Sequence, residues 1–238
     1  MSNKLSPQVV LIYSGGLDSS VLLSKLVASF DSDEIVALNF NYGSKHNTRE
    51  RHAAKQVCER LGVELVEINL PFVNELFKSD LLSSGAEIPD GHYEAESMKK
   101  TVVPFRNGIM LSIAAGYAES VGAKKVAIAS HRGDRCIYPD CRREFTEAMS
   151  IATQLGTSKN IQIISPFNNL MKWDIVRIGL NNGAPFHLTW SCYKGTERPC
   201  LSCGTCQERA ESFYKNYVQD PALSIEEWEE ALKIIKKN

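Results

Sequence analysis

The residues from Ser14 to Ser20, with the sequence SGGLDSS, have the side chains and the flexibility needed to bind phosphate groups. Gly15 and Gly16 allow the backbone to approach an anion closely and to adopt φ angles that other residues resist. Backbone N–H groups in such a turn, at the start of a helix, point at the anion and are aided by the helix dipole. Asp18 would repel a bare phosphate, so we expect it either to cap the helix or to hold Mg²⁺.

The loop is neither of the two most common phosphate-binding motifs. It lacks both G-x-x-x-x-G-K-[ST] and G-x-G-x-x-G. The simplest alternative is a strand–turn–helix junction with a serine cap. A phosphate site is favoured because the serines and glycines lie together where a predicted strand meets a predicted helix.

Four cysteines near the C-terminus, Cys192, Cys200, Cys203 and Cys206, have the spacing of a metal site. The last three form C-x₂-C-x₂-C, which gathers several sulfurs in a short stretch, and the first arrives across a short loop. Four thiolates favour one structural Zn²⁺ in a closed tetrahedral site. An iron–sulfur cluster and unmetallated thiols are the alternatives.

The other three cysteines are scattered, and no metal role is predicted for them. Cys58 lies in a predicted helix and is expected in the core, whereas Cys136 and Cys141 border a loop. An odd total of seven cysteines, four of them clustered, is typical of a reducing cytosol and argues against a disulfide framework. We therefore expect a cytoplasmic protein.

Basic and polar residues follow several predicted strands. Arg106 and Asn107 begin a helix, where an arginine is unfavourable unless an anion binds nearby. The stretches 131–135 (HRGDR) and 138–145 (YPDCRREF) follow the fourth strand, and His46 follows the second. Ligands bind at the carboxyl ends of parallel strands, and arginines there suit carboxylate or phosphate groups.

The elements that position these residues alternate along the chain. Strands are predicted at 8–13, 34–40, 63–70, 125–130 and 161–165, and helices at 18–30, 46–61, 105–121, 142–155, 207–217 and 224–236. This alternation predicts an α/β fold with a Rossmann-like parallel sheet of five strands and helices on both faces. We expect residues 1–182 to form this domain and residues 183–238 to form a small zinc-binding segment packed on it. Segment 71–103 is expected to be a flexible lid or an insertion with a little helix.

The composition excludes several classes of protein. The chain has 238 residues, a net charge of -1, and 43% hydrophobic and 23% charged residues, which are values of a globular protein. The near-zero charge argues against a basic face for nucleic acid. No apolar run approaches the roughly 18 residues that a membrane span requires, and the N-terminal apolar run is too short for a signal peptide. We therefore predict no membrane and no nucleic-acid partner.

The loop SGGLDS resembles that of the PP-loop ATP pyrophosphatases, a superfamily with an adenine nucleotide alpha-hydrolase-like fold. Further stretches narrow the resemblance to the 7-cyano-7-deazaguanine (preQ0) synthase family. They are YSGGLDSS, FNYGSKH, VPFRNGIMLS, GDRCIYPDCRREF, and LTWSCYKG followed by PCLSCGTCQER. Together they span Tyr13 to Arg209. The chain departs from the family pattern at Lys45, where a glutamine or arginine is expected, and the tail after Ser212 has no fixed pattern.

The resemblance implies a reaction in which 7-carboxy-7-deazaguanine, ammonia and ATP give the nitrile, AMP and pyrophosphate through an adenylated carboxylate and an amide. It also implies Mg²⁺ with ATP, one structural Zn²⁺ per subunit, free ammonia as the nitrogen source and a homodimer. Asp18, Ser14 and Arg106 are the expected catalytic residues. The expected ATP-binding residues are Tyr13, Ser14, Gly15, Gly16, Leu17, Asp18, Ser19, Ser20, Val21, Leu22 and Leu23.

Two other functions are compatible with the motifs. A PP-loop tRNA-modifying enzyme shares the loop, but such enzymes usually carry an RNA-binding appendage or a reactive cysteine pair. A non-catalytic nucleotide-binding or zinc-scaffold protein is the third alternative.

Overall fold

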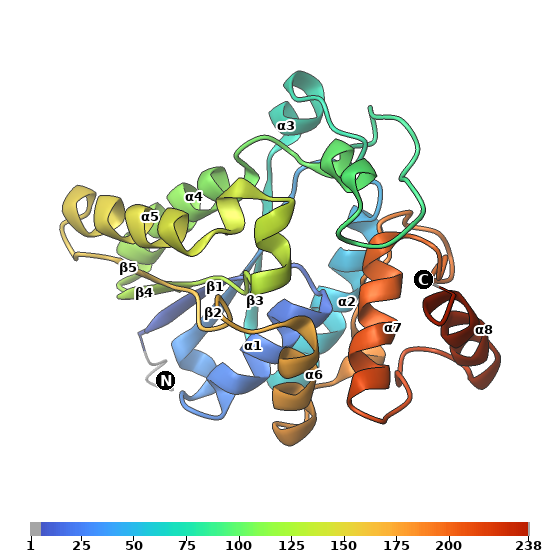
Figure 1. The fold of residues 1–238 in the computed structure, drawn as a ribbon. Helices are drawn as coiled ribbons and strands as arrows, with labels where there is room; N and C mark the ends of the chain where they lie inside the picture. Colours follow the sequence, from blue (N-terminus) through green and yellow to red (C-terminus); the bar gives the residue numbers. More distant parts are fainter. Residues whose placement is uncertain (1–5, 238) are drawn as a thin grey trace.

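A parallel β-sheet forms the centre of the molecule in this computed structural model, which describes residues 6–237 (Figure 1). The strands are β1 (Val9–Ile12), β2 (Ile35–Asn41), β3 (Glu64–Asn69), β4 (Lys125–Ala127) and β5 (Gln162–Ile164). Their order is β3-β2-β1-β4-β5, and every neighbouring pair is parallel. The predicted fold class is confirmed, although β4 and β5 are shorter than expected.

The strand order reverses beside β1, and this reversal locates the ligand-binding edge. From β1 the chain builds outward through β2 to β3, and it then returns to the other side of β1 to form β4 and β5. The connections leaving β1 and β4 therefore diverge to opposite sides of the sheet. Open α/β sheets bind their ligands in the crevice that such a divergence creates at the carboxyl ends of the strands.

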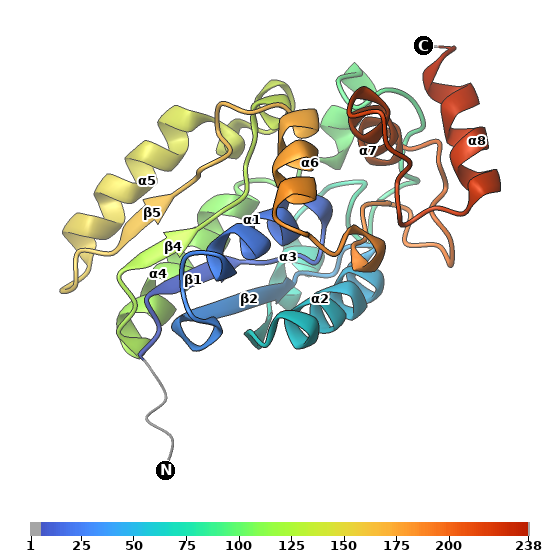
Figure 2. The same ribbon diagram turned by 90° about the horizontal axis from the view of Figure 1, so that it is seen from below.

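Helices cover both faces of the sheet (Figures 1 and 2). Alternate residues of β1 point to opposite faces, so Val10 packs with Leu111 in one core cluster and Leu11 packs with Val21 and Ile175 in the other. The helices are α1 (Leu17–Val27), α2 (Asn47–Leu61), α3 (Pro71–Leu76), α4 (Arg106–Val121), α5 (Arg143–Gly156), α6 (Lys172–Asn181), α7 (Gly204–Lys215) and α8 (Ile225–Ile235).

The helix α6 is not among the predicted elements. It begins after Met171, which is an unusual N-cap residue, and Gly179 interrupts its apolar pattern. Gly179 is buried where α6 packs against Val21 of α1 and against Phe186. The glycine that weakens the helical pattern in the sequence is therefore the residue that allows the two helices to approach each other.

The free edge of β5 is covered by hydroxyl groups of α5. The backbone N–H of Ile163 donates to Ser150 Oγ at 3.0 Å, and Thr153 Oγ1 donates to the carbonyl of Ile161 at 2.8 Å. The N–H of Ile161 donates to Thr157 Oγ1 at 2.9 Å. These three bonds pair backbone groups that a sixth strand would otherwise pair, which makes the short edge strand less open to association.

Segment 71–103 is an insertion with short helices, one of the two forms expected. It contains α3 and a 3₁₀ helix, Glu96–Thr101. The Nζ atom of Lys45 lies within hydrogen-bonding distance of four carbonyl oxygens in this insertion, those of Asp80, Leu82, Gly85 and Ala86, at 2.5–3.1 Å. The residue that departs from the family pattern thus holds the insertion in place.

The C-terminal helix α7 packs against α6, and α8 packs against α7 (Figure 2). They begin within three residues of the predicted positions. Within residues 6–237, no helix combines the length and the apolar character needed to cross a bilayer.

A matched pair of glycine substitutions tests the packing of α6 against α1. In Gly179→Ala the new methyl would lie 2.7 Å from Val21 Cγ2 and even closer to the ring of buried Phe186. We expect a loss of about 1–3 kcal/mol in the free energy of unfolding from overpacking. Gly116 in α4 is exposed with nothing nearby, so Gly116→Ala should instead stabilise by about 0.4–1 kcal/mol. Urea denaturation measures the free energy of unfolding of both variants. Equal changes in the two variants would contradict this account.

Candidate active site

The glycine–serine loop lies between β1 and α1 and is tightly enclosed by backbone. Gly15 has φ +84°, and a Cβ there would lie 2.6 Å from the backbone nitrogen of Ala54 in α2. The carbonyl of Gly15 accepts a hydrogen bond from the N–H of Trp190 at 3.1 Å. Ser14 Oγ accepts from the N–H of Gly16 at 3.0 Å and pairs with Ser19 Oγ at 3.1 Å. The loop is therefore held in one shape before any ligand binds.

A pocket opens above this loop at the carboxyl ends of β1, β2 and β4. The loop lines it with Ser14 and Gly16, and α1 lines it with Leu17, Asp18 and Ser19. Of the other predicted ATP-binding residues, Tyr13 lines the pocket too. Gly15, Ser20, Val21, Leu22 and Leu23 are not among its lining residues, and all five are buried in the loop and in α1.

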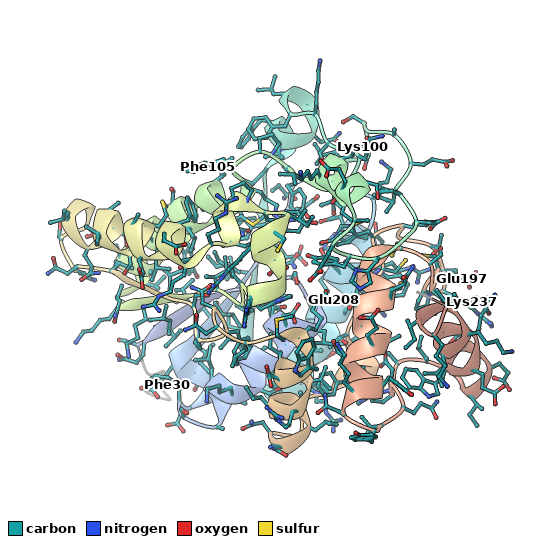
Figure 3. The ribbon with its side chains drawn as sticks, viewed as in Figure 1. Phe30, Lys100, Phe105, Glu197, Glu208 and Lys237 are labelled. Atoms are coloured by element: carbon teal, nitrogen blue, oxygen red, sulfur yellow. The ribbon has the colours of Figure 1, made fainter. Side chains whose placement is uncertain are left out.

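One end of the pocket carries a cluster of charged side chains around Lys172. The Nζ atom of Lys172, the first residue of α6, lies 2.7 Å from Glu208 Oε2 and 3.3 Å from Asp18 Oδ2. Burial lowers the pKa of Lys172, but the carboxylates of Asp18, Glu208 and Asp134 raise it more, and the net pKa lies above the usual value. Glu208 comes from α7 (Figure 3). This end of the pocket therefore holds a permanently charged ammonium.

Asp18 has an oxygen available for a cation. The N-cap residue of α1 is Gly16, and no side chain caps the helix, so Asp18 does not have the capping role considered from the sequence. Its Oδ2 faces Lys172, whereas Oδ1 is buried without a hydrogen-bond partner. An unpaired buried carboxylate oxygen is costly, and carboxylate oxygen is the ligand that Mg²⁺ prefers. The residues present thus fit the predicted Mg²⁺.

Aromatic side chains surround Arg106 at the other end of the pocket. Arg106 Nη1 donates to the hydroxyl of Tyr42 at 3.2 Å, and the guanidinium lies 5.5 Å from the centre of that ring. His46 stacks on Tyr193 with ring centres 5.1 Å apart, and its Nε2 lies 3.3 Å from Glu50 Oε2. Among residues 6–237, no carboxylate lies within 4.0 Å of Arg106. Its charge is therefore available to an anionic ligand.

The start of α4 is strained and firmly anchored. Phe105, the N-cap residue, has φ +53°, a left-handed conformation that is rare outside glycine, and it lies at the surface beside α4 (Figure 3). The N–H of Asn107 donates to Asp140 Oδ2 at 2.8 Å, and Asn107 Nδ2 lies 3.1 Å from Cys141 Sγ. Asp140 and Cys141 therefore fix the helix start that carries Arg106. Strain held in this way is typical of a functional position.

The structure brings His46 into the pocket but not the other predicted arginines. Arg132, Arg142 and Arg143 are exposed, and Arg143 pairs with Glu147 on its own helix. Arg135 donates to the carbonyl of Asn168. Of the arginines expected to meet an anion at this edge, only Arg106 lines the pocket.

Several residues in or beside the pocket were not singled out from the sequence, among them Lys172, Glu208 and Tyr93. The Tyr93 hydroxyl donates to Asp134 Oδ1 at 2.8 Å, and its ring faces the Lys172 ammonium at 5.5 Å. Each comes from a different segment. Glu208 lies in the stretch PCLSCGTCQER, in which only the cysteines were singled out. A lysine at the beginning of an unpredicted helix gives no signal until the fold buries it beside carboxylates.

The four cysteines come together at the N-terminus of α7. The sulfur atoms of Cys192, Cys200, Cys203 and Cys206 all lie within 4.8 Å of one another. The N–H of Cys203 lies 3.3 Å from Cys200 Sγ, and that of Cys200 lies 3.4 Å from Cys192 Sγ. Such N–H donors stabilise thiolates that bind a metal. The set closes on itself and could hold a metal ion.

The fold and the pocket define the class of this protein. It is a parallel α/β protein whose first strand leads into an S-G-G-x-D-S loop, which is the PP-loop architecture. The family model of QueC, described as queuosine biosynthesis protein QueC, matches residues 8–217. The chain belongs to this family.

Curated relatives are similar over most of their length. The chain is 49% identical over 212 residues to the 7-cyano-7-deazaguanine synthase of Porphyromonas gingivalis, covering 89% of this chain and 94% of the relative. It is 45% identical over 231 residues to the synthase of that name from Archaeoglobus fulgidus, covering 97% and 95%.

Among solved structures, the U34-tRNA thiolase NcsA from Methanococcus maripaludis, with its 4Fe–4S cluster, overlaps with a TM-score of 0.49 at 16% identity. The overlap covers 97% of this chain and 73% of that one. This distant likeness says nothing about what the present chain binds.

Thiol titration of the native, metal-loaded protein tests whether the cluster is closed. Cys136 is exposed, whereas Cys58 and Cys141 are buried, and burial raises the pKa of Cys58 to about 12. Thiolate is the reactive form, so we expect one thiol to react rapidly with a disulfide reagent and none in Cys136→Ser. Unfolding with a chelator should expose all seven cysteines. Rapid reaction of several thiols in the native protein would show that no metal closes the cluster.

Proposed function

We propose that the chain is an ATP-dependent ligase that forms C–N bonds, converting 7-carboxy-7-deazaguanine and ammonia to 7-cyano-7-deazaguanine in queuosine-type biosynthesis. Membership in the QueC family and the names of the relatives support the product. The observation that carries the proposal is one pocket with two ends. A phosphate-binding loop with Lys172 lies at one end and an arginine without a carboxylate partner lies at the other.

The proposed chemistry begins with the activation of a carboxylate. A carboxylate is a poor electrophile because its oxygen leaves with difficulty, whereas AMP is a good leaving group. The carboxylate attacks the α-phosphorus of ATP, and pyrophosphate leaves. Ammonia then displaces AMP to give the amide. A second adenylation, on the amide oxygen, allows AMP to leave again with loss of a proton, and the nitrile forms.

The residues of the pocket have distinct roles in this proposal. N–H and hydroxyl groups of the loop, including Ser14, together with Lys172, stabilise the charge that develops on the departing pyrophosphate. Asp18 holds Mg²⁺, which offsets phosphate charge when bound. Arg106 binds the substrate carboxylate, and the rings of Tyr42 and Tyr193 border the flat heterocycle. Much of the rate enhancement is then positioning.

The cysteine cluster completes the proposal with one structural Zn²⁺ per chain. Four sulfurs from one short segment leave no open coordination position, which is typical of structural zinc. We also infer a cytoplasmic homodimer from the family resemblance.

Product analysis tests the proposed reaction directly. Incubation with ATP, Mg²⁺, ammonium and 7-carboxy-7-deazaguanine should yield the nitrile, with a mass one water below that of the amide, and two AMP per nitrile. Omission of the acid or of ammonium should abolish nitrile formation. Liquid chromatography with mass spectrometry resolves these products. Release of ADP and orthophosphate would contradict the proposal.

Replacement of Arg106 tests the assignment of the carboxylate end. Loss of a charge-assisted hydrogen bond of about 1.5–3 kcal/mol should raise the KM for the deazaguanine acid roughly 10–100-fold in Arg106→Met, with the KM for ATP nearly unchanged. Arg143→Met, an exposed control, should leave both constants unchanged. A larger effect on ATP than on the acid would place Arg106 at the nucleotide instead.

A further inference from the structure

The turn that follows β4 fixes the protonation pattern of His131. The side chain is 1% exposed, and its Nδ1 accepts a hydrogen bond from the N–H of Gly133 at 3.0 Å. A ring nitrogen that accepts a hydrogen bond carries no proton. The ring proton therefore lies on Nε2, and His131 presents an N–H donor there.

The same turn also fixes the orientation of the ring. The N–H of His131 donates to Asp134 Oδ2 at 3.1 Å, which closes a reciprocal cap with the bond from Gly133. A Cβ at Gly133 would lie 2.9 Å from His131 Cε1 and 3.0 Å from Glu208 Oε1. Only glycine leaves room for the imidazole in this position.

The fixed donor lies beside the carboxylates of Asp134 and Asp18. His131 Nε2 lies 3.4 Å from Asp134 Oδ1 and 3.9 Å from Asp18 Oδ2, and it makes no hydrogen bond. Lys172 approaches the same oxygen of Asp18 at 3.3 Å. Lys172 therefore contacts Oδ2 of Asp18, and His131 Nε2 lies just beyond hydrogen-bonding distance of the same oxygen, while Oδ1 is buried without a partner. The carboxylate is oriented with one oxygen held and the other free.

We propose that His131 is a positioning residue whose Nε2–H, together with Lys172, holds Oδ2 of Asp18 so that Oδ1 is presented to the divalent cation that accompanies ATP. The inference rests on the proposed function, since it assigns the cation to Asp18. The groups that surround the imidazole support it. Asp134 Oδ1 already accepts a hydrogen bond from the hydroxyl of Tyr93 at 2.8 Å, and Glu208 pairs with Lys172 at 2.7 Å.

This role has a physical basis in the outer shell of metal sites. Hydrogen bonds to a ligating carboxylate set its orientation, and their loss typically weakens cation binding or activity roughly 10–100-fold. The Nε2–H of His131 is also a buried donor without an acceptor, which is unfavourable in isolation. A small movement of Asp18 toward the imidazole would satisfy that donor while its other oxygen binds the cation.

Two amide substitutions separate the two nitrogens of His131. His131→Asn places an oxygen near the position of Nδ1, so it keeps the bond from Gly133 but loses the donor toward Asp18. His131→Gln reaches the position of Nε2 with an amide N–H but loses the acceptor for Gly133. If the donor is what matters, asparagine should impair cation binding more than glutamine does, although it better preserves the turn.

The test measures the cation as well as turnover. Mn²⁺ binding in the presence of α,β-methylene-ATP, followed by electron paramagnetic resonance, should weaken roughly 10–100-fold in His131→Asn. The half-saturating Mg²⁺ concentration for turnover should rise in parallel, with the KM for the deazaguanine acid unchanged. The Mn²⁺ affinity and the half-saturating Mg²⁺ concentration of His131→Gln should be closer to those of the wild-type protein. Unaltered Mn²⁺ binding in His131→Asn, or equal loss in both variants, would overturn the proposal.

A measurement on the wild-type protein tests the proposal even if a variant fails to fold. Long-range ¹H–¹⁵N correlation spectra of its five histidines distinguish the two neutral tautomers. A proton on Nδ1 of His131 would overturn the proposal, and a proton on Nε2 is the expected result. If the unchanged protein makes no nitrile, the proposed function fails separately. The spectra and the Mn²⁺ titration still decide the role of His131.

Discussion

The close contact between Gly15 and the backbone of α2 is the constraint on which the site depends. The left-handed φ of Gly15 and the lack of space for a Cβ fix the loop between β1 and α1. Trp190 closes it from the other side by bonding to the Gly15 carbonyl. Trp190 is itself held through Arg209, whose guanidinium donates to Asp220 Oδ2 at 2.5 Å and to Thr189 Oγ1 at 2.8 Å. The C-terminal segment thus helps to shape the glycine–serine loop.

This arrangement explains why residues that are distant in sequence line one pocket. Trp190, Tyr193 and Thr205 line the pocket beside residues of the parallel sheet domain. Asp90 forms a β-bridge to Cys203, and three residues later Tyr93 reaches the charged end of the pocket. The expected division into 1–182 and 183–238 stays a prediction, but the pocket draws its walls from both parts.

Local sequence signals predicted the elements that position the site. The residues that tertiary contacts bring to it could not be predicted from those signals. The loop Ser14–Ser20, the five strands and the four cysteines follow from residue types at short spacing, which is information carried within one segment. Lys172 and Glu208 could not be predicted in this way. Their importance depends on the burial of one ammonium between carboxylates that come from two other helices, α1 and α7. The helix α6 escaped prediction because Gly179 serves packing between helices and weakens the local pattern.

The central claim is that the acid attacks the α-phosphorus of ATP, and oxygen isotope transfer tests it most directly. With both carboxylate oxygens of the deazaguanine acid labelled with ¹⁸O, each AMP released during nitrile formation should carry one labelled oxygen on its phosphate, as read by mass spectrometry. Label in orthophosphate, or AMP that carries only unlabelled oxygen, would contradict the account.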